Sequence, residues 1–330
     1  MPIDFKNRVA LVTGAGGGLG RTYAIELARR GAAVVVNDLG GAFDGKGSSQ
    51  SMADTVVSEI VAAGGKAVAS YDSVGTRAGG EAIVATAMQS FGRVDIVINN
   101  AGHLRNAPFE SITDDILDSI IEVHLKGAFY VTQPAYRIMQ KQRYGRIVFA
   151  SSAAGLLGNA TQAAYAAAKA GLVGLMHALS LEGAEYGVLC NALLPTANSR
   201  MAQALPPEQL EKFSAQFASI AQYAGNSLDP HFVTPLVVYL ASEACKSTHA
   251  IYSATWGRYA RAFLALSEGW LGPRDQPASV EDVAHHFTAI ESREKLVFPQ
   301  SLADEFSELI KTIERGGDRG RRRIGPAPPR

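Results

Sequence analysis

Short apolar runs alternate with amphipathic stretches through the first half of the chain. The apolar runs, which we expect to be strands, are Arg8–Thr13, Ala33–Asp38, Ala67–Tyr71, Val94–Asn99, Arg146–Ser151 and Gly187–Leu193. The amphipathic stretches, which we expect to be helices, are Leu19–Arg30, Met52–Ala63, Glu81–Phe91, Asp114–Gln140 and Gln162–Tyr186. Apolar strands that alternate with helices are typical of a parallel sheet covered on both faces. The pattern predicts an α/β fold, a Rossmann-type doubly wound parallel sheet.

The alternation is less regular after Leu193. A helix is predicted from Pro207 to about Tyr223, because its apolar side chains fall on one helical face. These side chains, which form either ordinary core or a lid over a substrate, are Leu210, Phe213, Phe217 and Ile220. One more helix and a last strand are expected in residues 231–254. Three helices without a strand are expected in residues 255–314, where Ser279 and Asp282 have the spacing of a helix N-terminus.

Three segments follow from this order of elements. Residues 1–255 are predicted to form the main domain, and residues 256–314 a helical C-terminal extension packed on it. Residues 315–330 carry six Arg and one Asp, which predicts a basic, disordered tail. Because the formal net charge of the whole chain is zero, the remaining residues carry a charge of −5. A weakly acidic body does not favour nucleic-acid binding.

Composition narrows the class of protein further. Apolar residues make up 47% and charged residues 19%, enough for a buried core. We expect no membrane span, because the sequence has no apolar run of about 18 residues, and no signal peptide. Cys190 and Cys245 lie in apolar surroundings and are interpreted as reduced core residues. Together with a C-terminus that has no peroxisomal address, these features predict a cytoplasmic protein. No spacing suggests a metal site, and His285 and His286 are expected at the surface.

A glycine-rich loop follows the first predicted strand and leads directly into a helix. The loop reads Thr13-Gly14-Ala15-Gly16-Gly17-Gly18-Leu19-Gly20. Glycines there let backbone N–H groups approach a pyrophosphate, and the helix N-terminus adds a favourable dipole. Asp38 ends the second strand, where a carboxylate accepts hydrogen bonds from a ribose 2′-hydroxyl and repels a 2′-phosphate. No Arg lies within the loop or directly after Asp38, so the sequence favours NAD over NADP.

Ser152, Tyr165 and Lys169 form a candidate catalytic set. Tyr165 and Lys169 are four residues apart on a predicted helix and therefore share a face. A free tyrosine has a pKa of about 10, and a nearby ammonium is expected to lower it. Ser152 lies at the end of a strand, where its hydroxyl can hold a substrate oxygen while Tyr165 moves the proton.

With these motifs in this order, residues 1–255 resemble the short-chain dehydrogenase/reductase family. The motifs are the glycine loop, Asn99-Asn100-Ala101-Gly102, Ser152 and Tyr165-x-x-x-Lys169. A closer resemblance, over about residues 4–312, is to the (3R)-hydroxyacyl-CoA dehydrogenase modules of peroxisomal multifunctional enzymes of type 2, also described as 17β-hydroxysteroid dehydrogenases of type 4. The segments that carry it include Val36–Gly41, Tyr71–Val74, Val123–Gly127, Tyr144–Ile147 and Ser199–Met201.

The resemblance implies a role for each matching residue. Ser152, Tyr165 and Lys169 would be catalytic, and Tyr165 and Lys169 would also contact the cofactor. The residues that would line the dinucleotide are Gly14, Gly18, Leu19, Gly20, Asp38, Asp72, Ser73, Asn99, Pro195, Asn198 and Ser199. The resemblance also implies a homodimer or homotetramer through the Ala-rich helix around residues 163–170, although a purely internal contact of that helix fits the sequence as well.

Two positions depart from the family pattern. His124 stands where the family usually has an asparagine that supports a relay water, so the relay must differ. Thr196 follows Pro195 where the family usually has glycine. His103, after the Asn-Asn-Ala-Gly turn, either faces the active site or is an ordinary loop histidine.

The sequence therefore predicts an NAD-dependent alcohol dehydrogenase. By resemblance, its reaction would convert a (3R)-3-hydroxyacyl-CoA to the 3-oxoacyl-CoA, with no nucleic-acid or membrane partner. Oxidation of a steroid or another bulky secondary alcohol is the alternative, because it needs the same residues and only a different pocket. A dinucleotide sensor without turnover is less favoured, because Ser152, Tyr165 and Lys169 are all present.

Overall fold

An eight-stranded sheet forms the centre of the first unit of the computed structural model, which describes residues 3–41, 47–198 and 223–321. The chain divides into two compact units, Met1–Ala262 and Phe263–Arg330, and each is described by itself. The strand order is β3-β2-β1-β4-β5-β6-β7-β8. The strands are β1 (Val9–Thr13), β2 (Ala33–Asn37), β3 (Lys66–Ser70), β4 (Ile96–Asn99), β5 (Gly145–Ala150), β6 (Val188–Thr196), β7 (Ala250–Thr255) and β8 (Arg258–Ala262).

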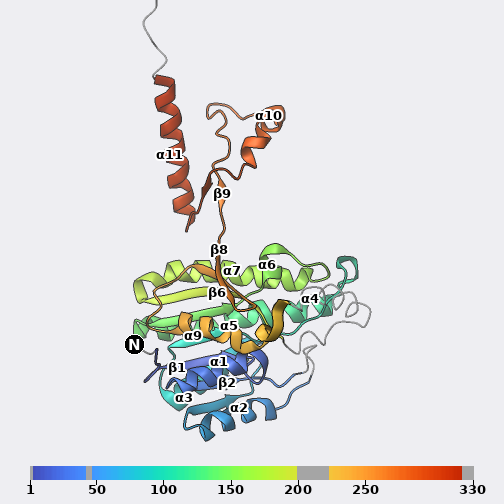
Figure 1. Ribbon diagram of the computed structural model, residues 1–330, viewed down its shortest axis with the longest axis vertical. Coiled ribbons are helices and arrows are strands. Elements are labelled where there is room, and N and C mark those ends of the chain that lie inside the picture. Colours follow the sequence, from blue (N-terminus) through green and yellow to red (C-terminus); the bar gives the residue numbers. More distant parts are fainter. Residues whose placement is uncertain (1–2, 42–46, 199–222, 322–330) are drawn as a thin grey trace, which may run out of the picture. The chain divides into compact units, whose positions relative to one another are not determined.

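The first seven strands in this sheet are parallel, and only β8 runs antiparallel to its neighbour β7. The strand order reverses between β1 and β4, so the loops after these strands diverge and leave a crevice at their carboxyl ends. This arrangement confirms the predicted doubly wound fold and puts the glycine loop and the residues after β4 and β5 at the same edge of the sheet (Figure 1).

Helices cover both faces of the sheet. The helices are α1 (Gly18–Arg29), α2 (Ser51–Ala62), α3 (Arg77–Phe91), α4 (Asp114–Ile120), α5 (Gly127–Gln142), α6 (Ala153–Leu157), α7 (Ala163–Gly183) and α9 (Thr234–Ala241). Buried residues of α1, α2 and α9 pack into one apolar cluster, and those of α3, α5 and α7 pack into another. Strands β1 to β7 each contribute to both clusters, because their side chains alternate between the two faces.

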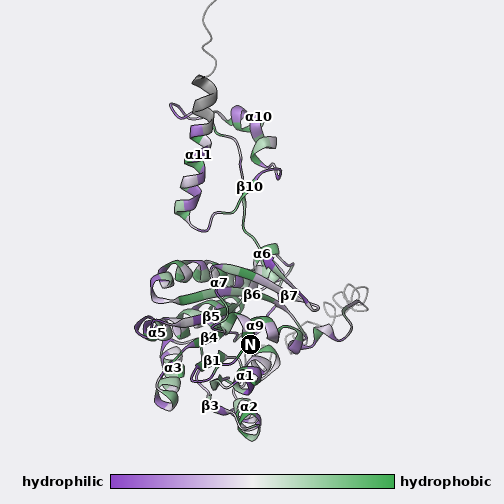
Figure 2. Ribbon diagram, turned by 60° about the vertical axis from the view of Figure 1, so that its left-hand side comes forward, coloured by the Kyte–Doolittle hydropathy of each residue, from purple (hydrophilic) through white to green (hydrophobic). Residues whose placement is uncertain are grey.

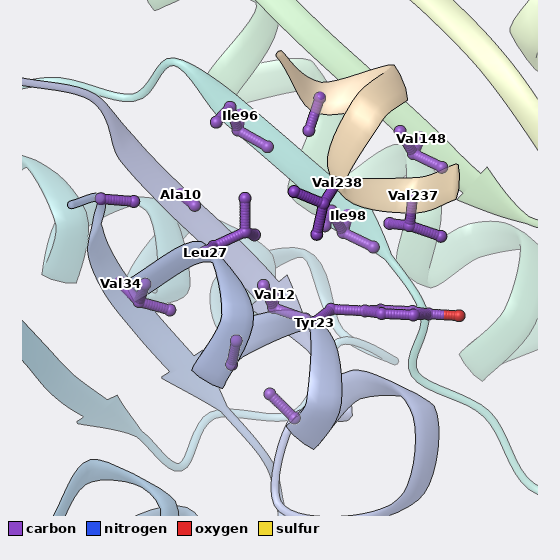
Figure 3. Packing of buried hydrophobic residues seen from close by; sticks show 14 of the residues in the cluster. Ala10, Val12, Tyr23, Leu27, Val34, Ile96, Ile98, Val148, Val237 and Val238 are labelled. Carbon is purple, nitrogen blue, oxygen red and sulfur yellow. The ribbon is translucent and has the colours of Figure 1, made fainter. Parts of the chain in front are cut away.

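Strand β1 shows this alternation clearly. Ala10 and Val12 belong to the cluster with Tyr23 and Leu27 of α1, whereas Leu11 belongs to the opposite cluster. Figure 3 shows the first cluster, with the ring of Tyr23 and the side chain of Leu27 packed beside β1, β4 and α9. All five side chains of β1 itself are buried, which explains why the strand reads as a continuous apolar run.

The predicted helix Asp114–Gln140 is interrupted in the structure. A π-helical turn, Ile121–Lys126, separates α4 from α5. The extra residue of such a turn changes the face on which the following side chains lie, and π turns occur frequently at functional sites. The turn contains His124, which is buried.

One segment of the described chain, Ala163–Tyr186, is long and apolar enough to span a membrane by length and composition alone. The sequence itself predicted no such segment, because it contains no apolar run of about 18 residues. It comprises α7 and the turn that follows, and Leu172, Val173, Leu175 and Met176 pack into the core against the sheet. These contacts are those of a core helix in an α/β domain.

The second unit contains β9 (Leu266–Ser267), α10 (Val280–Ile290), β10 (Leu296–Val297) and α11 (Leu302–Arg321), with β9 and β10 antiparallel. The predicted N-terminus of α10 is confirmed, because Ser279 and Asp282 form a reciprocal capping box. Along α11, hydrophobic and hydrophilic residues alternate (Figure 2). Among the second unit's described side chains from 263 to 314, none is buried.

Several expectations for the C-terminal third were wrong. Residues 255–314 were expected to contain three helices and no strand, but the described residues contain β8, β9 and β10 and two helices. The units divide after Ala262, and α11 continues to Arg321, into the predicted disordered tail. That the extension packs on the first unit stays a prediction. The predicted helix from Pro207 lies outside the described residues except for its end at Tyr223.

Candidate active site

The glycine loop joins β1 to α1 by a turn that only small residues allow. A Cβ at Gly20 would overlap the carbonyl oxygen of Gly14, so the helix begins in direct backbone contact with the loop. Gly18 has φ +52°, a conformation that favours glycine, and a Cβ there would meet no other atom. The loop is thus closely packed at Gly14 and Gly20 and open at Gly18, as a cradle for a pyrophosphate requires.

Hydrogen bonds made by the side chains of Thr13 and Asn100 hold this loop in place. The Thr13 Oγ1 accepts hydrogen bonds from the backbone N–H groups of Asn100 and Ala101, each at 3.0 Å. The Asn100 side chain donates to the carbonyl oxygens of Thr13 at 3.0 Å and of Gly14 at 3.1 Å. Nothing in the sequence indicated a role for these two side chains, although Thr13 begins the glycine loop and Asn100 lies in the Asn-Asn-Ala-Gly motif. Their hydrogen bonds connect the turns after β1 and β4.

Asp38 lies directly after β2 and faces the glycine loop. One carboxylate oxygen accepts a hydrogen bond from the backbone N–H of Gly16 at 2.7 Å, and the other from Gly40 at 2.7 Å. Each oxygen retains a lone pair for another donor. Arg21, just after the loop, is paired with Glu59. Within the part of the chain that the structure describes, Asp38 therefore places a carboxylate beside the loop at Gly16, and the guanidinium of Arg21 is engaged by Glu59.

The other predicted dinucleotide contacts border the same edge of the sheet. The Asp72 carbonyl accepts a hydrogen bond from the Asn37 side chain at 2.9 Å, and the Ser73 hydroxyl accepts from the backbone of Gly75 at 3.2 Å. Asn99 is buried at the end of β4 and donates to the Thr132 hydroxyl at 2.9 Å. Leu19 packs partly buried against the core of α1.

The last predicted cofactor contacts lie at the end of strand β6 and directly after it. Pro195 lies in β6 beside Ala254 of β7, and Thr196 and Thr255 are joined by their hydroxyls at 3.1 Å. The backbone N–H of Asn198 donates to the carbonyl of Leu228 at 2.6 Å. Ser199 lies outside the described residues.

Ser152, Tyr165 and Lys169 come together across β5, α6 and α7. Ser152 caps α6, and its hydroxyl accepts from the backbone N–H of Ala154 at 3.2 Å. The Ser152 side chain lies close enough to Tyr165 to act to lower its pKa, and the Lys169 Nζ lies 5.6 Å from the centre of the Tyr165 ring. The Nζ donates to the carbonyl of Ala150, the last residue of β5, at 2.6 Å. The predicted set is therefore one cluster.

Burial controls the protonation of this pair. It raises the pKa of Tyr165, although Ser152 acts in the opposite direction. It also lowers the pKa of Lys169 to about 7. In the chain by itself, the expected lowering of the Tyr165 pKa by Lys169 therefore does not outweigh burial. The physical reason is that Tyr165 is itself buried, which disfavours its charged phenolate form.

Backbone packing sets the position of Ser152. A Cβ at Gly155 would lie 2.8 Å from the backbone nitrogen of Ala170, so α6 approaches α7 closely at this glycine. The Ser151 hydroxyl donates to the carbonyl of Lys169 at 2.7 Å. The Ala-rich start of α7 thus makes an internal contact, which was one of the two interpretations of that run.

His103 and His124 close the inner side of the site. Both are buried, and the ring of His124 meets the Tyr165 ring edge to face, with centroids 5.2 Å apart. The backbone of His103 contacts the imidazole of His124. His103 therefore borders the site, which the sequence left open.

The loop at Gly18, the carboxylate of Asp38 and the turn after β4 together fit a nicotinamide dinucleotide, because they offer an open N–H cradle and a ribose acceptor along one edge. Among the described residues, no group of three or more His, Cys, Asp or Glu side chains could hold a metal ion. Cys190 and Cys245 are buried and free, and burial raises the pKa of the Cys190 thiol.

Comparison with known proteins agrees with this geometry. Residues 8–209 match the family described as short chain dehydrogenase. The chain is 41% identical over 324 residues to peroxisomal multifunctional enzyme type 2 of Mus musculus, covering 97% of this chain and 41% of that protein. It is 36% identical over 262 residues to the hydroxyacyl-CoA dehydrogenase ChsB1 of Mycobacterium tuberculosis, covering 77% of this chain and 78% of that protein.

A solved structure shows the same fold. The full-length peroxisomal multifunctional enzyme type 2 of Drosophila melanogaster superposes with a TM-score of 0.75 and 33% identity, covering 95% of this chain and 50% of that one. The chain thus spans half or less of the length of these two multifunctional relatives.

Proposed function

Because the chain belongs to the short-chain dehydrogenase family, it is an oxidoreductase that acts on CH–OH groups of small molecules with a nicotinamide dinucleotide, and we propose that its reaction is the NAD-dependent oxidation of (3R)-3-hydroxyacyl-CoA to 3-oxoacyl-CoA. Two lines support the substrate class. The motifs around Asp38, Asp72 and His124 resemble (3R)-hydroxyacyl-CoA dehydrogenase modules. A relative that matches most of this chain carries the name hydroxyacyl-CoA dehydrogenase.

The observation that carries the proposed chemistry is the cluster of Ser152, Tyr165 and Lys169 at the carboxyl end of β5. Ser152 holds the substrate hydroxyl oxygen and stabilises the negative charge that develops on it. Tyr165, as phenolate, takes the hydroxyl proton, and the C3 hydrogen leaves as hydride. Lys169 stabilises the phenolate by its charge. The bound dinucleotide supplies the hydride acceptor, so one alcohol becomes one ketone with release of one proton.

We propose NAD as the cofactor in preference to NADP. Asp38 places a negative charge where the adenosine ribose would lie, and Arg21 already pairs with Glu59. Gly14, Gly18, Leu19 and Gly20 would surround the pyrophosphate. A 2′-phosphate beside Asp38 would be repelled.

The experiment that tests the substrate class compares two series. The purified chain is offered CoA esters of 3-hydroxy acids of increasing length and a set of 17β-hydroxysteroids, and NADH formation is followed by absorbance. Turnover of the CoA esters supports the proposal. Turnover of the steroids alone would assign the alternative, oxidation of a bulky secondary alcohol.

We also propose a homo-oligomer. Phe129 of α5 is 47% exposed and Leu181 of α7 is 52% exposed, whereas other large apolar side chains of these helices, such as Val131 and Leu172, are buried in the core. Large exposed apolar side chains on neighbouring helices are typical of protein contacts. If light scattering measures the mass of a single chain, the proposed homo-oligomer is contradicted.

A cytoplasmic location stays a proposal, supported by the two reduced cysteines. Two of the relatives described above carry peroxisomal names, so the peroxisome is the alternative location. A fluorescent fusion of the chain expressed in eukaryotic cells and imaged beside a peroxisomal marker distinguishes the two.

A further inference from the structure

Two imidazoles stack on each other at a distance from the candidate active site. His177 lies in α7, about two turns beyond Lys169, and His249 directly precedes β7. Their ring centroids are 4.1 Å apart, and the ring planes are tilted by 39°. Both residues are half-buried. The stack therefore connects α7 to the turn before β7 through two side chains of the type that titrates closest to neutral pH.

A serine ties the second ring to the same turn of α7. The Ser180 Oγ lies 2.7 Å from the carbonyl oxygen of His177 and 2.6 Å from Nδ1 of His249. Because the carbonyl can only accept, it takes the single hydroxyl proton, and Nδ1 of His249 donates to the Ser180 oxygen. The backbone N–H of His249 donates to the carbonyl of Cys190 in β6 at 2.8 Å. The turn is thus held on α7 by a side chain and on β6 by its backbone.

Two features show that this contact is held at a cost. His249 has φ +59°, in the left-handed region that residues other than glycine rarely adopt. The Nε2 of His177 is buried and has no hydrogen-bond partner among the residues that the structure describes. A strained backbone and an unpaired polar atom persist only where the surrounding contacts hold them. Movement of the turn away from α7 relieves both, so the contact has a closed arrangement and an accessible released one.

We propose that His177 and His249 form an acid-sensitive latch, which holds the turn before β7 on α7 at neutral pH and releases it when the pair takes up a proton. Protonation of His177 places a charged imidazole, with a buried and unpartnered nitrogen, against a second imidazole. A buried charge without a partner is costly, whereas both rings are hydrated once the turn is released. The latch uses none of the groups of the proposed dehydrogenase reaction and does not rest on it.

The titration of His177 agrees with this geometry. Burial, and after it the neighbouring His249, lowers the pKa of His177 to about 4. An exposed histidine has a pKa of about 6.5. Between these two values the released chain binds more protons than the closed one. The closed arrangement is therefore fully favoured above about pH 6.5 and loses stability as the pH falls toward about 4.

The pH response of the latch is assigned to the two imidazoles because of what surrounds them. Within the described part of the chain, His249 is the titratable group that acts on the pKa of His177. Cys190, which bonds to the His249 backbone, is a neutral thiol, because burial raises its pKa. The charged side chains on the elements around the pair are exposed, and they are Glu182 of α7, Glu185 of the following turn, Lys246 of the turn before β7 and Arg261 of β8.

Nitrogen shifts of the labelled imidazoles in the full chain measure proton uptake, and amide hydrogen exchange measures release. We expect His177 to be neutral at about pH 6 and to titrate well below an exposed histidine. After correction for the intrinsic exchange rate, the His249 amide should lose about tenfold or more of its protection between about pH 7 and about pH 5. The Val148 amide, in the middle of β5, reports global unfolding and should keep its protection.

Substitutions separate the proton from the packing of the ring. His177→Phe keeps an aromatic ring against His249 but takes up no proton, and its face attracts a protonated His249, so the His249 amide should stay protected at about pH 5. His177→Leu, which is smaller, should also show less pH dependence than the wild type, whatever the fit of the phenyl ring. Ser180→Ala removes the tie but no titratable group, and should release the turn at a higher pH. His285→Phe, at an exposed position of α10, is the matched control and should behave as the wild type.

Four results would each overturn the latch. They are a His177 that titrates as His285 does, an equal loss of protection in the wild type and both His177 variants, a parallel loss at His249 and Val148 in the wild type, and release at the wild-type pH in Ser180→Ala. Because no readout uses a substrate, a failure of the proposed dehydrogenase reaction leaves all of these outcomes unchanged.

Discussion

The Nζ of Lys169 donates a hydrogen bond to the carbonyl oxygen of Ala150 at 2.6 Å, and so connects the middle of the site to the end of β5. The contact crosses from α7 to the sheet strand that also leads to Ser152. It fixes the ammonium at a distance of 5.6 Å from the Tyr165 ring centre.

Removal of the Tyr165 hydroxyl should abolish turnover without loss of the fold. Tyr165→Phe keeps the ring that packs on His124 but removes the proton acceptor, so kcat should fall about 10²- to 10⁴-fold. NAD binding, measured by calorimetry, should stay close to wild type. Tyr136→Phe is the control, because the Tyr136 hydroxyl is also buried but lies on α5 in the core. Turnover near wild type in Tyr165→Phe would remove this residue from the mechanism.

The charge of Asp38 should set the cofactor preference. Asp38→Ala should narrow the ratio of kcat/KM for NAD over NADP by about tenfold or more, because a 2′-phosphate is no longer repelled. Asp38→Asn removes the charge but keeps an acceptor for the Gly16 N–H. If only the alanine variant narrows the ratio, loop geometry and not charge is the cause. Equal kcat/KM for both cofactors in the wild type would contradict the assignment of NAD.

The buried Lys169 should make the stability of the unliganded protein depend on pH. Its pKa is about 7 in the folded chain and about 10.4 in an unfolded one. Between these values the unfolded chain binds one proton more, so the free energy of unfolding rises with pH, by at most about 1.4 kcal/mol per unit from this group. Below about pH 7 Lys169 is protonated in both the folded and the unfolded chain, so this group no longer makes the free energy of unfolding depend on pH.

Urea unfolding of the wild type and of Lys169→Met between about pH 6 and about pH 11 measures this effect, because this window brackets the two pKa values. The slope of the free energy against pH should be smaller in Lys169→Met. Parallel lines for the two proteins would show that Lys169 keeps a normal pKa in the fold.

Gly155 should be intolerant of even a methyl group. Gly155→Ala puts a Cβ 2.8 Å from the backbone nitrogen of Ala170, which should cost about 1–3 kcal/mol of stability and displace Ser152, lowering kcat. Gly174→Ala is the matched control in α7, because a Cβ there meets nothing within 4 Å. It should stabilise the protein by about 0.5–1 kcal/mol without a change in kcat. Equal effects of the two substitutions on thermal unfolding would contradict the close packing of α6 on α7.

The main elements of the first unit could be predicted from the sequence because burial leaves a strong pattern there. Strand β1 was expected from Arg8 to Thr13 and is observed from Val9 to Thr13. The prediction succeeded because all five side chains of the strand are buried. The same reasoning failed for β8, whose residues Arg258–Ala262 form an edge strand with two exposed Arg side chains and no apolar run.

The site was predictable only where one motif contains the whole arrangement. Tyr165 and Lys169 lie on one helix, and the glycine loop is continuous in sequence, so spacing sufficed. The contact between His103 and His124 joins residues 21 apart across a π-helical turn, which no periodicity shows. The raised pKa of Tyr165 also required the structure, because it depends on how deeply Tyr165 itself is buried and not on its spacing from Lys169.

The stereochemistry of one reaction shows whether Ser152 and Tyr165 carry out the proposed oxidation of a (3R)-3-hydroxyacyl-CoA. The purified chain is given NAD with the pure (3R) or the pure (3S) enantiomer of one long-chain 3-hydroxyacyl-CoA, and NADH is followed by absorbance. The account predicts NADH from the (3R) ester and a rate at least about a hundredfold lower from the (3S) ester, because a fixed Ser152–Tyr165 pair accepts only one orientation of the hydroxyl. Equal rates, a preference for the (3S) ester, or no NADH from either ester with a folded, NAD-binding protein would contradict it.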